Sequence, residues 1–307
     1  MIKLRAEFKL QVFGLIAALL TVTIWATFLI ATRFALQSDF TVQEVLVLRL
    51  LPASIIFAPL MFKMGVLPRG QSWPRSIILM VGASAVFPYI VSSGLAYAPA
   101  SDGGALAPGM LPFWTAIAAF SLSGERPGLC RGIGLGMILL GAICVGLLQI
   151  IIGASTEIWK GHIMFLLGSG CFAIYSVVFR ESDLSPTHGL VLGLFWGSLI
   201  ITPILFLSGN VNFFRFQYRE LLLTIVLQSF IIGVLATLLF NYAVQILGAA
   251  ETGAFGALTP IIALLGGVIL LDEVVTPLKV FGVLLVAVGV VLASGLVGNH
   301  ILKRNGD

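Results

Sequence analysis

The chain has 307 residues, of which 59% are hydrophobic and 10% are charged, and its formal net charge is +4. Soluble domains carry about 25% charged and about 45–50% apolar residues, so this composition excludes a water-soluble globule and indicates a membrane protein. The small positive excess does not indicate a surface for nucleic acid.

Long windows without a charged side chain recur along the whole chain. A helix needs roughly 20 apolar residues to cross about 30 Å of hydrocarbon, and nine windows are long enough. They are 10–32, 76–101, 103–124, 132–156, 161–179, 184–214, 221–250, 252–271 and 280–302. A tenth window, 45–62, contains one charge, Arg49. The sequence therefore predicts an all-α integral membrane protein with ten transmembrane helices.

The first window is expected to remain as a membrane anchor. No A-x-A-like cleavage site precedes polar sequence and nine further windows follow, so a cleaved signal peptide is not indicated. Lys and Arg near helix ends mark the cytoplasmic side. With the N-terminus inside, eleven Lys and Arg face the cytoplasm and five face the other side. We expect a multi-pass membrane protein with both termini cytoplasmic.

The two halves of the chain resemble each other at a nearly constant offset. At offsets of 147 or 148 the matched pairs are Arg33 with Arg180, Pro112 with Pro260, Glu125 with Glu273, Arg131 with Lys279, and Gly141 with Gly289. This predicts two five-helix repeats, 1–153 and 154–307. Because five is odd, the copies enter the membrane from opposite sides, as in transporters with inverted repeats. Such a repeat places a binding site between the halves and exposes it alternately.

Motifs at matched offsets resemble those of a known family. Each half has a helix in which a mid-span Pro leads to a Glu, followed by a Gly-rich helix. The residues are Trp25, Arg33 and Arg49, then Pro112, Glu125, Gly132, Gly134 and Gly141, and in the second half Pro260, Glu273, Gly282 and Gly289. The chain resembles the EamA-type ten-helix branch of the drug/metabolite transporter superfamily over nearly its whole length.

The resemblance implies an exporter or exchanger of the inner (plasma) membrane for amino acids, drugs or related metabolites. It also implies a central cavity lined by helices 1, 3, 4, 6, 8 and 9 and flanked by helices 2 and 7. One departure concerns the charge of that cavity, because the position equivalent to Arg49 in the second half is Trp196. The cavity is therefore expected to be electrostatically asymmetric.

Arg49 is the candidate for substrate recognition. An ionisable side chain inside the membrane costs roughly 2.5–3.5 kcal/mol even on the lenient insertion scale, and it is a functional-site hypothesis by default. We expect Arg49 to attract a substrate carboxylate. The alternative is that Arg49 snorkels to the outer face or braces helix 2.

Aromatic and amide side chains within the spans complete the predicted site. A Trp or Tyr that faces lipid tails leaves its N–H or O–H without a partner, so these residues are expected to point inward, where they line a cavity or pack between helices. The predicted substrate-binding residues are Trp25, Arg49, Tyr89, Trp114, Tyr175, Trp196 and Gln228. Gln228 alternatively forms an interhelical hydrogen bond worth about 0.6 kcal/mol.

The carboxylates all lie at the ends of the predicted helices. They include Asp102 and Glu251 at the turns that enter helices 4 and 9, and Glu125, Asp272 and Glu273 at helix ends. A proton-coupled antiporter generally needs a carboxylate inside the membrane, so the sequence favours facilitated diffusion or exchange. Asp102 and Glu251 could form gates or cap helix N-termini, and capping is the favoured interpretation.

No sequence motif indicates an enzyme, a cofactor or a metal site. The three His are scattered, and Cys130, Cys144 and Cys171 have no C-x-x-C spacing. The expected partners are a small-molecule substrate and the lipid bilayer, with no nucleic acid, and the chain is compatible with a monomer. The alternative to a transporter is a membrane protein that binds lipid or a partner subunit.

Overall fold

The structure is a computed structural model that describes residues 2–151, 157–247, 252 and 254–294. The first half contains α1 (Ile2–Gln37), α2 (Val42–Met64), α3 (Trp73–Val81), η1 (Gly82–Val86), α4 (Phe87–Tyr97), α5 (Ala100–Leu106), α6 (Leu111–Ser123) and α7 (Leu129–Ile151). The second half contains α8 (Ile158–Arg180), α9 (Pro186–Leu207), η2 (Phe213–Arg215), α10 (Tyr218–Ile225), η3 (Val226–Leu235), α11 (Ala236–Leu247), α13 (Leu258–Leu271) and α14 (Pro277–Ala293).

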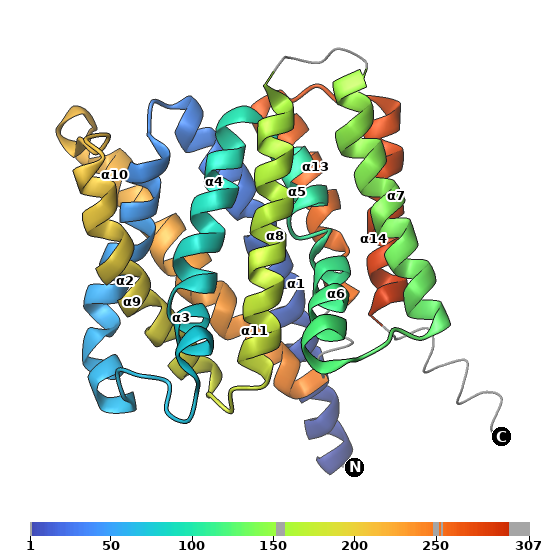
Figure 1. Ribbon diagram of the computed structural model, residues 1–307, viewed down its shortest axis with the longest axis horizontal. Helices are drawn as coiled ribbons and strands as arrows, with labels where there is room; N and C mark the ends of the chain where they lie inside the picture. The colour runs from blue at the N-terminus through green and yellow to red at the C-terminus, as the bar shows by residue number, and fades with distance from the viewer. Residues whose placement is uncertain (1, 152–156, 248–251, 253, 295–307) are drawn as a thin grey trace.

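These helices make ten crossings, which confirms the ten-helix membrane fold. Within the described residues, eight helical segments are long and apolar enough to span a membrane, and α13 and α14 are shorter apolar helices. The third crossing is α3–η1–α4, the fourth is α5–α6, and the eighth is α10–η3–α11. In Figure 1, α1 rises from the lower end whereas α8 descends from the upper end, so the halves run in opposite directions.

The two ends of the molecule are defined by their connections. The upper end of Figure 1 holds 38–41, 98–99, 208–217 and 272–276, and the lower end holds 65–72, 124–128 and 181–185. By the distribution of basic residues, the upper end is the expected outer side. This orientation remains a prediction.

The fourth crossing is interrupted inside the membrane, at 107–110. Its second piece, α6, has Pro112 in its first turn, where a missing N–H breaks no helical hydrogen bond. In the second half, α13 begins similarly, with Pro260 as its third residue. Both pieces end on a left-handed residue at equivalent positions, Gly124 and Asp272. Gly has no steric penalty in this conformation and Asp tolerates it better than most residues, so the repeat is visible in backbone geometry.

The third crossing of each half contains a π-helical segment. These segments are η1 in the first half and η3 in the second, at equivalent places along the chain. A π-helical turn displaces the helical hydrogen bonds and occurs frequently at functional sites. The buried side chains of η3 include Gln228 and Ser229.

The last crossings of the two halves, α7 and α14, pack backbone to backbone through glycines. A Cβ on Gly134 would lie 2.6 Å from the carbonyl oxygen of Gly289, and a Cβ on Gly141 would lie 2.6 Å from that of Gly282. Small residues allow such close approach between membrane helices, where van der Waals packing drives association. The glycine positions therefore join the two repeats.

Candidate functional site

Arg49 points from α2 into the space between helices of both halves. Its guanidinium carbon lies 4.6 Å from the centre of the Phe28 ring on α1, a geometry that favours cation–π attraction. Its Nη1 donates a long hydrogen bond of 3.4 Å to Oε1 of Gln228 on η3. Among the described residues, Arg49 has no carboxylate in an ion pair. The contacts with Phe28 and Gln228 thus orient the guanidinium, and no carboxylate among the described residues neutralises its charge.

Gln228 is fixed by a second hydrogen bond, which Nε2 donates to Oγ1 of Thr32 at 3.0 Å. The adjacent Ser229 accepts the backbone N–H of Ala53 at 3.0 Å. Ala53 follows Pro52, whose ring disturbs the regular hydrogen bonds of α2. Three helices, α1, α2 and η3, therefore meet through polar contacts. We call Phe28, Thr32, Arg49 and Gln228 the central polar site.

Aromatic rings extend from this site toward α8. Phe28 neighbours Phe87 at 6.5 Å between ring centres, and Phe87 contacts Phe172 at 4.8 Å. Tyr175 follows at 5.7 Å from Phe172 and stacks on Phe179. The structure thus connects Tyr175 to the central polar site through phenylalanines that the sequence did not single out.

The other predicted aromatics have different neighbours. Trp25 lies one helical turn before Phe28 on α1 and contacts Phe240 of α11 at 5.1 Å. Trp196 donates its indole N–H to the carbonyl of Val66 at 2.6 Å, at the lower end. Trp25 therefore packs against the second half through Phe240, and the indole N–H of Trp196 makes a structural hydrogen bond.

Tyr89 and Trp114 differ in accessibility. Tyr89 is 38% exposed on α4. The indole Nε1 of Trp114 is buried without a hydrogen-bond partner among the described residues, and its ring meets Phe113 edge-on. A buried indole N–H is normally hydrogen-bonded, so Trp114 retains an unused donor inside the bundle.

A second polar cluster, which we call the upper charge cluster, lies between α5, α8 and α14. Asp102 is fully buried, and its Oδ1 lies 2.7 Å from Nζ of Lys279. The angles of this contact are outside those of a hydrogen bond, so it is an ion pair by proximity. On the other side of the carboxylate, Oδ2 lies 2.9 Å from Nε2 of His162. Lys279 and His162 are also buried, so the charges have little contact with solvent.

Glu273 closes the same cluster from the connection between α13 and α14. It accepts the backbone N–H groups of Ala100 and Ser101 at 2.6 and 3.0 Å, and the Ser101 hydroxyl at 2.6 Å. Glu273 therefore caps α5 by hydrogen bonds. Asp102 lies in the first turn of α5, where its charge complements the helix dipole as expected, but it makes no capping hydrogen bond. Asp102 is the third residue of α5 and is turned toward Lys279 and His162 instead. Its counterpart in that expectation, Glu251, lies outside the described residues.

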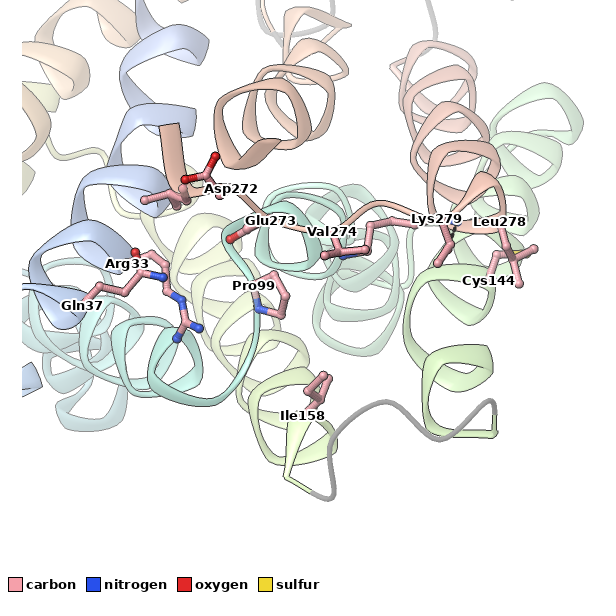
Figure 2. A pocket seen from close by; sticks show the side chains of 12 residues that line it. Arg33, Gln37, Pro99, Cys144, Ile158, Asp272, Glu273, Val274, Leu278 and Lys279 are labelled. Atoms are coloured by element: carbon pink, nitrogen blue, oxygen red, sulfur yellow. Dashed lines mark hydrogen bonds between the residues drawn. The ribbon is translucent and has the colours of Figure 1, made fainter. Parts of the chain in front are cut away.

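A pocket of about 400 Å³ opens beside this cluster at the upper end. Its wall includes Arg33 and Gln37 from α1 together with Asp272, Glu273 and Lys279 (Figure 2). Arg33 donates a hydrogen bond to the Leu95 carbonyl. The upper charge cluster is thus buried but lies next to a space that water can reach.

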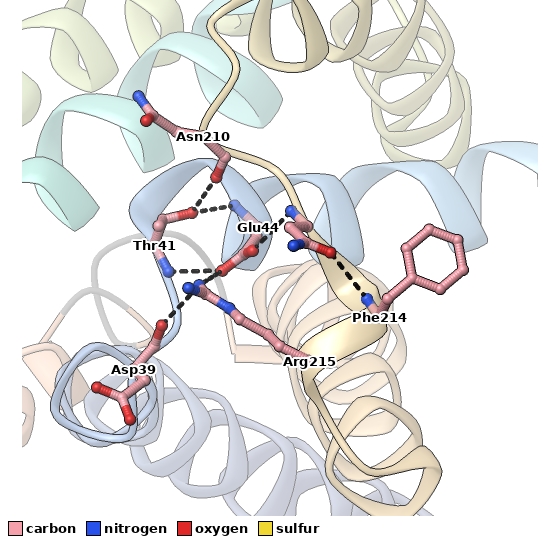
Figure 3. Close-up of polar contacts among 7 residues, drawn as sticks. Asp39, Thr41, Glu44, Asn210, Phe214 and Arg215 are labelled. Atoms are coloured by element: carbon pink, nitrogen blue, oxygen red, sulfur yellow. Dashed lines mark hydrogen bonds and ion pairs between the residues drawn. The ribbon is translucent and has the colours of Figure 1, made fainter.

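The upper end has another contact between the halves, around Glu44 at the start of α2. Its carboxylate accepts the backbone N–H groups of Thr41 and Asn212 at 2.8 and 2.9 Å, and Nη2 of Arg215 at 2.7 Å (Figure 3). Arg215 also donates to the carbonyl of Asp39 at 2.7 Å. These bonds attach the connection 208–217 to the first half.

The lower end holds its charges differently. Glu125, the equivalent of Glu273, is 48% exposed and pairs with Arg180 at 2.9 Å. Arg75 pairs with Glu181 at 2.9 Å, and both side chains are partly exposed. Exposed ion pairs contribute about 0–1 kcal/mol. Among the described residues, the buried ion pairs therefore lie at the upper end, and the two ion pairs at the lower end are partly exposed.

The repeat of two halves also appears in comparison with known families. The model of the EamA-like transporter family matches residues 12–147 and, a second time, residues 159–295. The chain belongs to the EamA-like transporter family. It is accordingly a multi-pass membrane protein of a transporter family, and its relatives are transporters rather than enzymes.

Two relatives of this EamA-like transporter are informative. "Uncharacterized transporter YyaM" of Bacillus subtilis (strain 168) is 30% identical over 216 residues, which are 66% of this chain and 67% of that protein. A solved structure described as "Crystal structure of protein" has a TM-score of 0.61 at 16% identity, and the match covers 96% of this chain and 99% of that one. The second likeness shows the fold alone.

Sequence reasoning about this EamA-like transporter missed His162 and Lys279. Lys279 was counted among the outer loop charges, and His162 was dismissed because the histidines are scattered. The available signal was that both lie near the starts of apolar helices, His162 as the fifth residue of α8 and Lys279 as the third of α14, at the same end as Asp102. Residues 60 and 177 positions from Asp102 meet only once the helices pack.

Proposed function

We propose that this chain transports small metabolites that combine a carboxylate with an apolar part, such as amino acids or amphipathic drug-like compounds. Transport would be export or exchange across the inner membrane by alternating access, with both termini in the cytoplasm. Arg49 would bind the carboxylate, and the neighbouring aromatic rings would contact the apolar part.

The observation that carries this proposal is the unneutralised charge of Arg49 between the two halves. Its guanidinium rests on Phe28 and touches Gln228 only through a long hydrogen bond. A guanidinium offers five N–H donors in a planar fork that matches a carboxylate. The Phe28–Phe87–Phe172 row starts at the same place and supplies apolar surface.

Alternating access is supported by the different contacts that two equivalent glutamates make at the two ends. Glu273 caps α5 across the boundary between the halves. Its equivalent, Glu125, is half-exposed and bound to Arg180. If the repeats exchange conformations, as inverted repeats do, Glu125 would adopt the buried arrangement when Glu273 leaves it.

The experiment that tests the proposal compares Arg49→Lys and Arg49→Ala with the wild type in proteoliposomes. A panel of amino acids, cationic drugs and sugars is tested for counterflow and for a substrate-dependent rise in melting temperature. Losing a charge-assisted hydrogen bond of about 1.5–3 kcal/mol weakens carboxylate binding about tenfold or more. Lys is expected to be intermediate because its compact ammonium lacks the planar fork.

Arg75→Ala is the matched control, because it removes an arginine whose ion pair with Glu181 is partly exposed. This variant should keep both counterflow and the melting shift. A folded Arg49→Ala protein with an unchanged melting shift would exclude Arg49 from binding. If no compound on the panel shows counterflow or a melting shift, the proposed substrate class is wrong, and binding of lipid or a partner subunit becomes the better hypothesis.

A further inference from the structure

We propose that the His162–Asp102 pair is a proton-binding site that takes up one proton when the upper end opens and releases it when that end closes. This inference rests on the proposed alternating access and adds an ion to it. It also revises the expectation, based on the positions of carboxylates in the sequence, that protons do not take part.

The closed arrangement leaves no place for a second proton on His162. Nε2 faces the Asp102 carboxylate at 2.9 Å and therefore carries the imidazole proton that it donates. Nδ1 is buried without a hydrogen-bond partner among the described residues. A Cβ added to Gly146 of α7 would lie 3.7 Å from Nδ1, an ordinary van der Waals distance, so this side of the ring faces the backbone of α7. A proton on Nδ1 would be a buried donor with no acceptor, which is costly.

Lys279 supplies the only positive charge in an ion pair with Asp102 among the described residues. With neutral His162, the carboxylate and the ammonium balance each other inside the protein. A second cation on the imidazole would compete with Lys279 for the same carboxylate. In the closed state the Asp102 carboxylate therefore already has its counter-ion, and opening is the step that would remove it.

Opening of the upper end would change this balance. Lys279 belongs to α14 in the second half, while Asp102 belongs to α5 in the first half. If α14 moves away from α5 and α8, Asp102 loses its cation and water from the adjacent pocket reaches His162. One proton from the outer solution then binds Nδ1, and the imidazolium replaces the ammonium as the partner of Asp102. Closing reverses both steps and returns the proton.

Other charged or titratable groups face this pair from the surrounding helices. Arg33 on α1, Cys144 on α7, and Asp272 and Glu273 before α14 line the pocket beside the pair, and Glu157 and Lys160 lie at the start of α8, the helix of His162. Glu273 is held by two backbone N–H groups and Ser101, and Glu157 and Lys160 form an exposed pair. The ordinary titration range of these groups lies away from neutrality. His162 is the group of the cluster that ordinarily titrates between pH 5 and 8.

The test measures opening directly, without a substrate. Cysteines replace Glu157 and Val274, which are exposed on the His162 side and on the connection that leads to Lys279, and the native cysteines are changed to alanine. Nitroxide labels at the two sites report their distance in nanodiscs by double electron–electron resonance between pH 8 and pH 5. Because the open state holds one more proton, a longer distance should gain population as the pH falls, by up to tenfold per pH unit.

His162→Gln keeps an N–H for Asp102 but cannot bind the proton, so its distance distribution should not change with pH. Asp102→Asn removes the anion that stabilises the imidazolium and should have the same effect, which provides a second variant if the first misfolds. His188→Gln is the matched control, since His188 contacts the carbonyl of Gly65 at the lower end. This control should keep the wild-type response.

Equal distributions at pH 8 and pH 5 in the otherwise unchanged protein would overturn the proposal. So would a His162→Gln variant that responds to pH like the wild type. Because no substrate is present in this experiment, either result says nothing about Arg49, whose role is tested by counterflow. If the Arg49 variants keep normal counterflow, the proposed substrate binding is wrong, and the proton site is still tested by the distance measurements.

Discussion

Asp102 and Lys279 form a buried ion pair, with Nζ of Lys279 2.7 Å from Oδ1 of Asp102. Both side chains are buried, and moving a single ion out of water costs several kcal/mol. Their mutual attraction, with the hydrogen bond from Lys279 to Ser101 at 3.2 Å, offsets that cost. Each residue therefore depends on the other more than on the apolar helices around it.

We predict that Lys279→Met destabilises the protein by about 3–5 kcal/mol, because it leaves the Asp102 carboxylate buried without its cation. The double variant Lys279→Met, Asp102→Asn should recover a large part of this loss, since no uncompensated charge remains. Thermal unfolding in detergent measures both. Lys160→Met is the control, because its pair with Glu157 is exposed and contributes little. A double variant as unstable as the single one would contradict the explanation.

Arg49, unlike Asp102 and Lys279, has no oppositely charged partner among the described residues. Its described contacts are an aromatic ring and an amide oxygen, which orient a guanidinium but do not neutralise it. Gln228 is in turn held by Thr32. Such a supported but unpaired charge is suited to bind an anion that comes and goes.

Among the helices, the pair α7 and α14 makes the closest approach of the two repeats. The contact has no room for a side chain at Gly141, where a Cβ would meet the backbone of Gly282 at 2.6 Å. At Gly136, five residues closer to the start of α7, a Cβ would meet nothing within 4 Å. One helix thus has a packed face and an open face.

We predict that Gly141→Leu separates α7 from α14 and lowers the melting temperature in detergent strongly, because the backbone cannot yield as a flexible side chain would. Gly136→Leu, the matched control, should change the melting temperature little, since its side chain enters open space. Equal effects of the two substitutions would show that helix propensity, rather than close packing, sets the role of these glycines.

The fourth crossing, α5–α6, runs between the two ends of the molecule. Its upper piece, α5, carries Asp102 and is capped by Glu273, and its lower piece, α6, leads to Glu125. The interruption at 107–110 lies between them. A broken helix can change the angle between its halves while each half stays helical, so this crossing is suited to link opening at one end with closing at the other.

At the scale of the whole molecule, the orientation in the membrane remains to be measured. We predict that a cysteine at Ser38 or Asn210 reacts with an impermeant thiol reagent in intact cells, and that one at Arg69 or Ser72 does not. All four positions are exposed at the ends of the molecule, two at each end. The physical basis is the excess of Lys and Arg at the lower end. The reverse pattern of labelling would invert the topology.

The charge-free windows and the offset of 147 or 148 were sufficient to predict ten helices in two repeats. This works because hydrocarbon demands a continuous apolar stretch from each crossing, whatever its neighbours are. The same demand makes an intramembrane arginine conspicuous, so Arg49 could be found from the sequence. Gln228 was found for the same reason, as a buried amide in an apolar window.

The sequence by itself thus determined the helices, the repeat and the presence of unusual polar residues, since these depend on each segment and its solvent. Only the tertiary structure decided which polar residues meet. In the structure, Asp102, which was expected to cap a helix, contacts Lys279 and His162. The indole N–H of Trp196 donates a hydrogen bond to the Val66 carbonyl. Such pairings depend on how helices pack and rotate against each other, and two residues far apart in a chain carry no local sign of that contact.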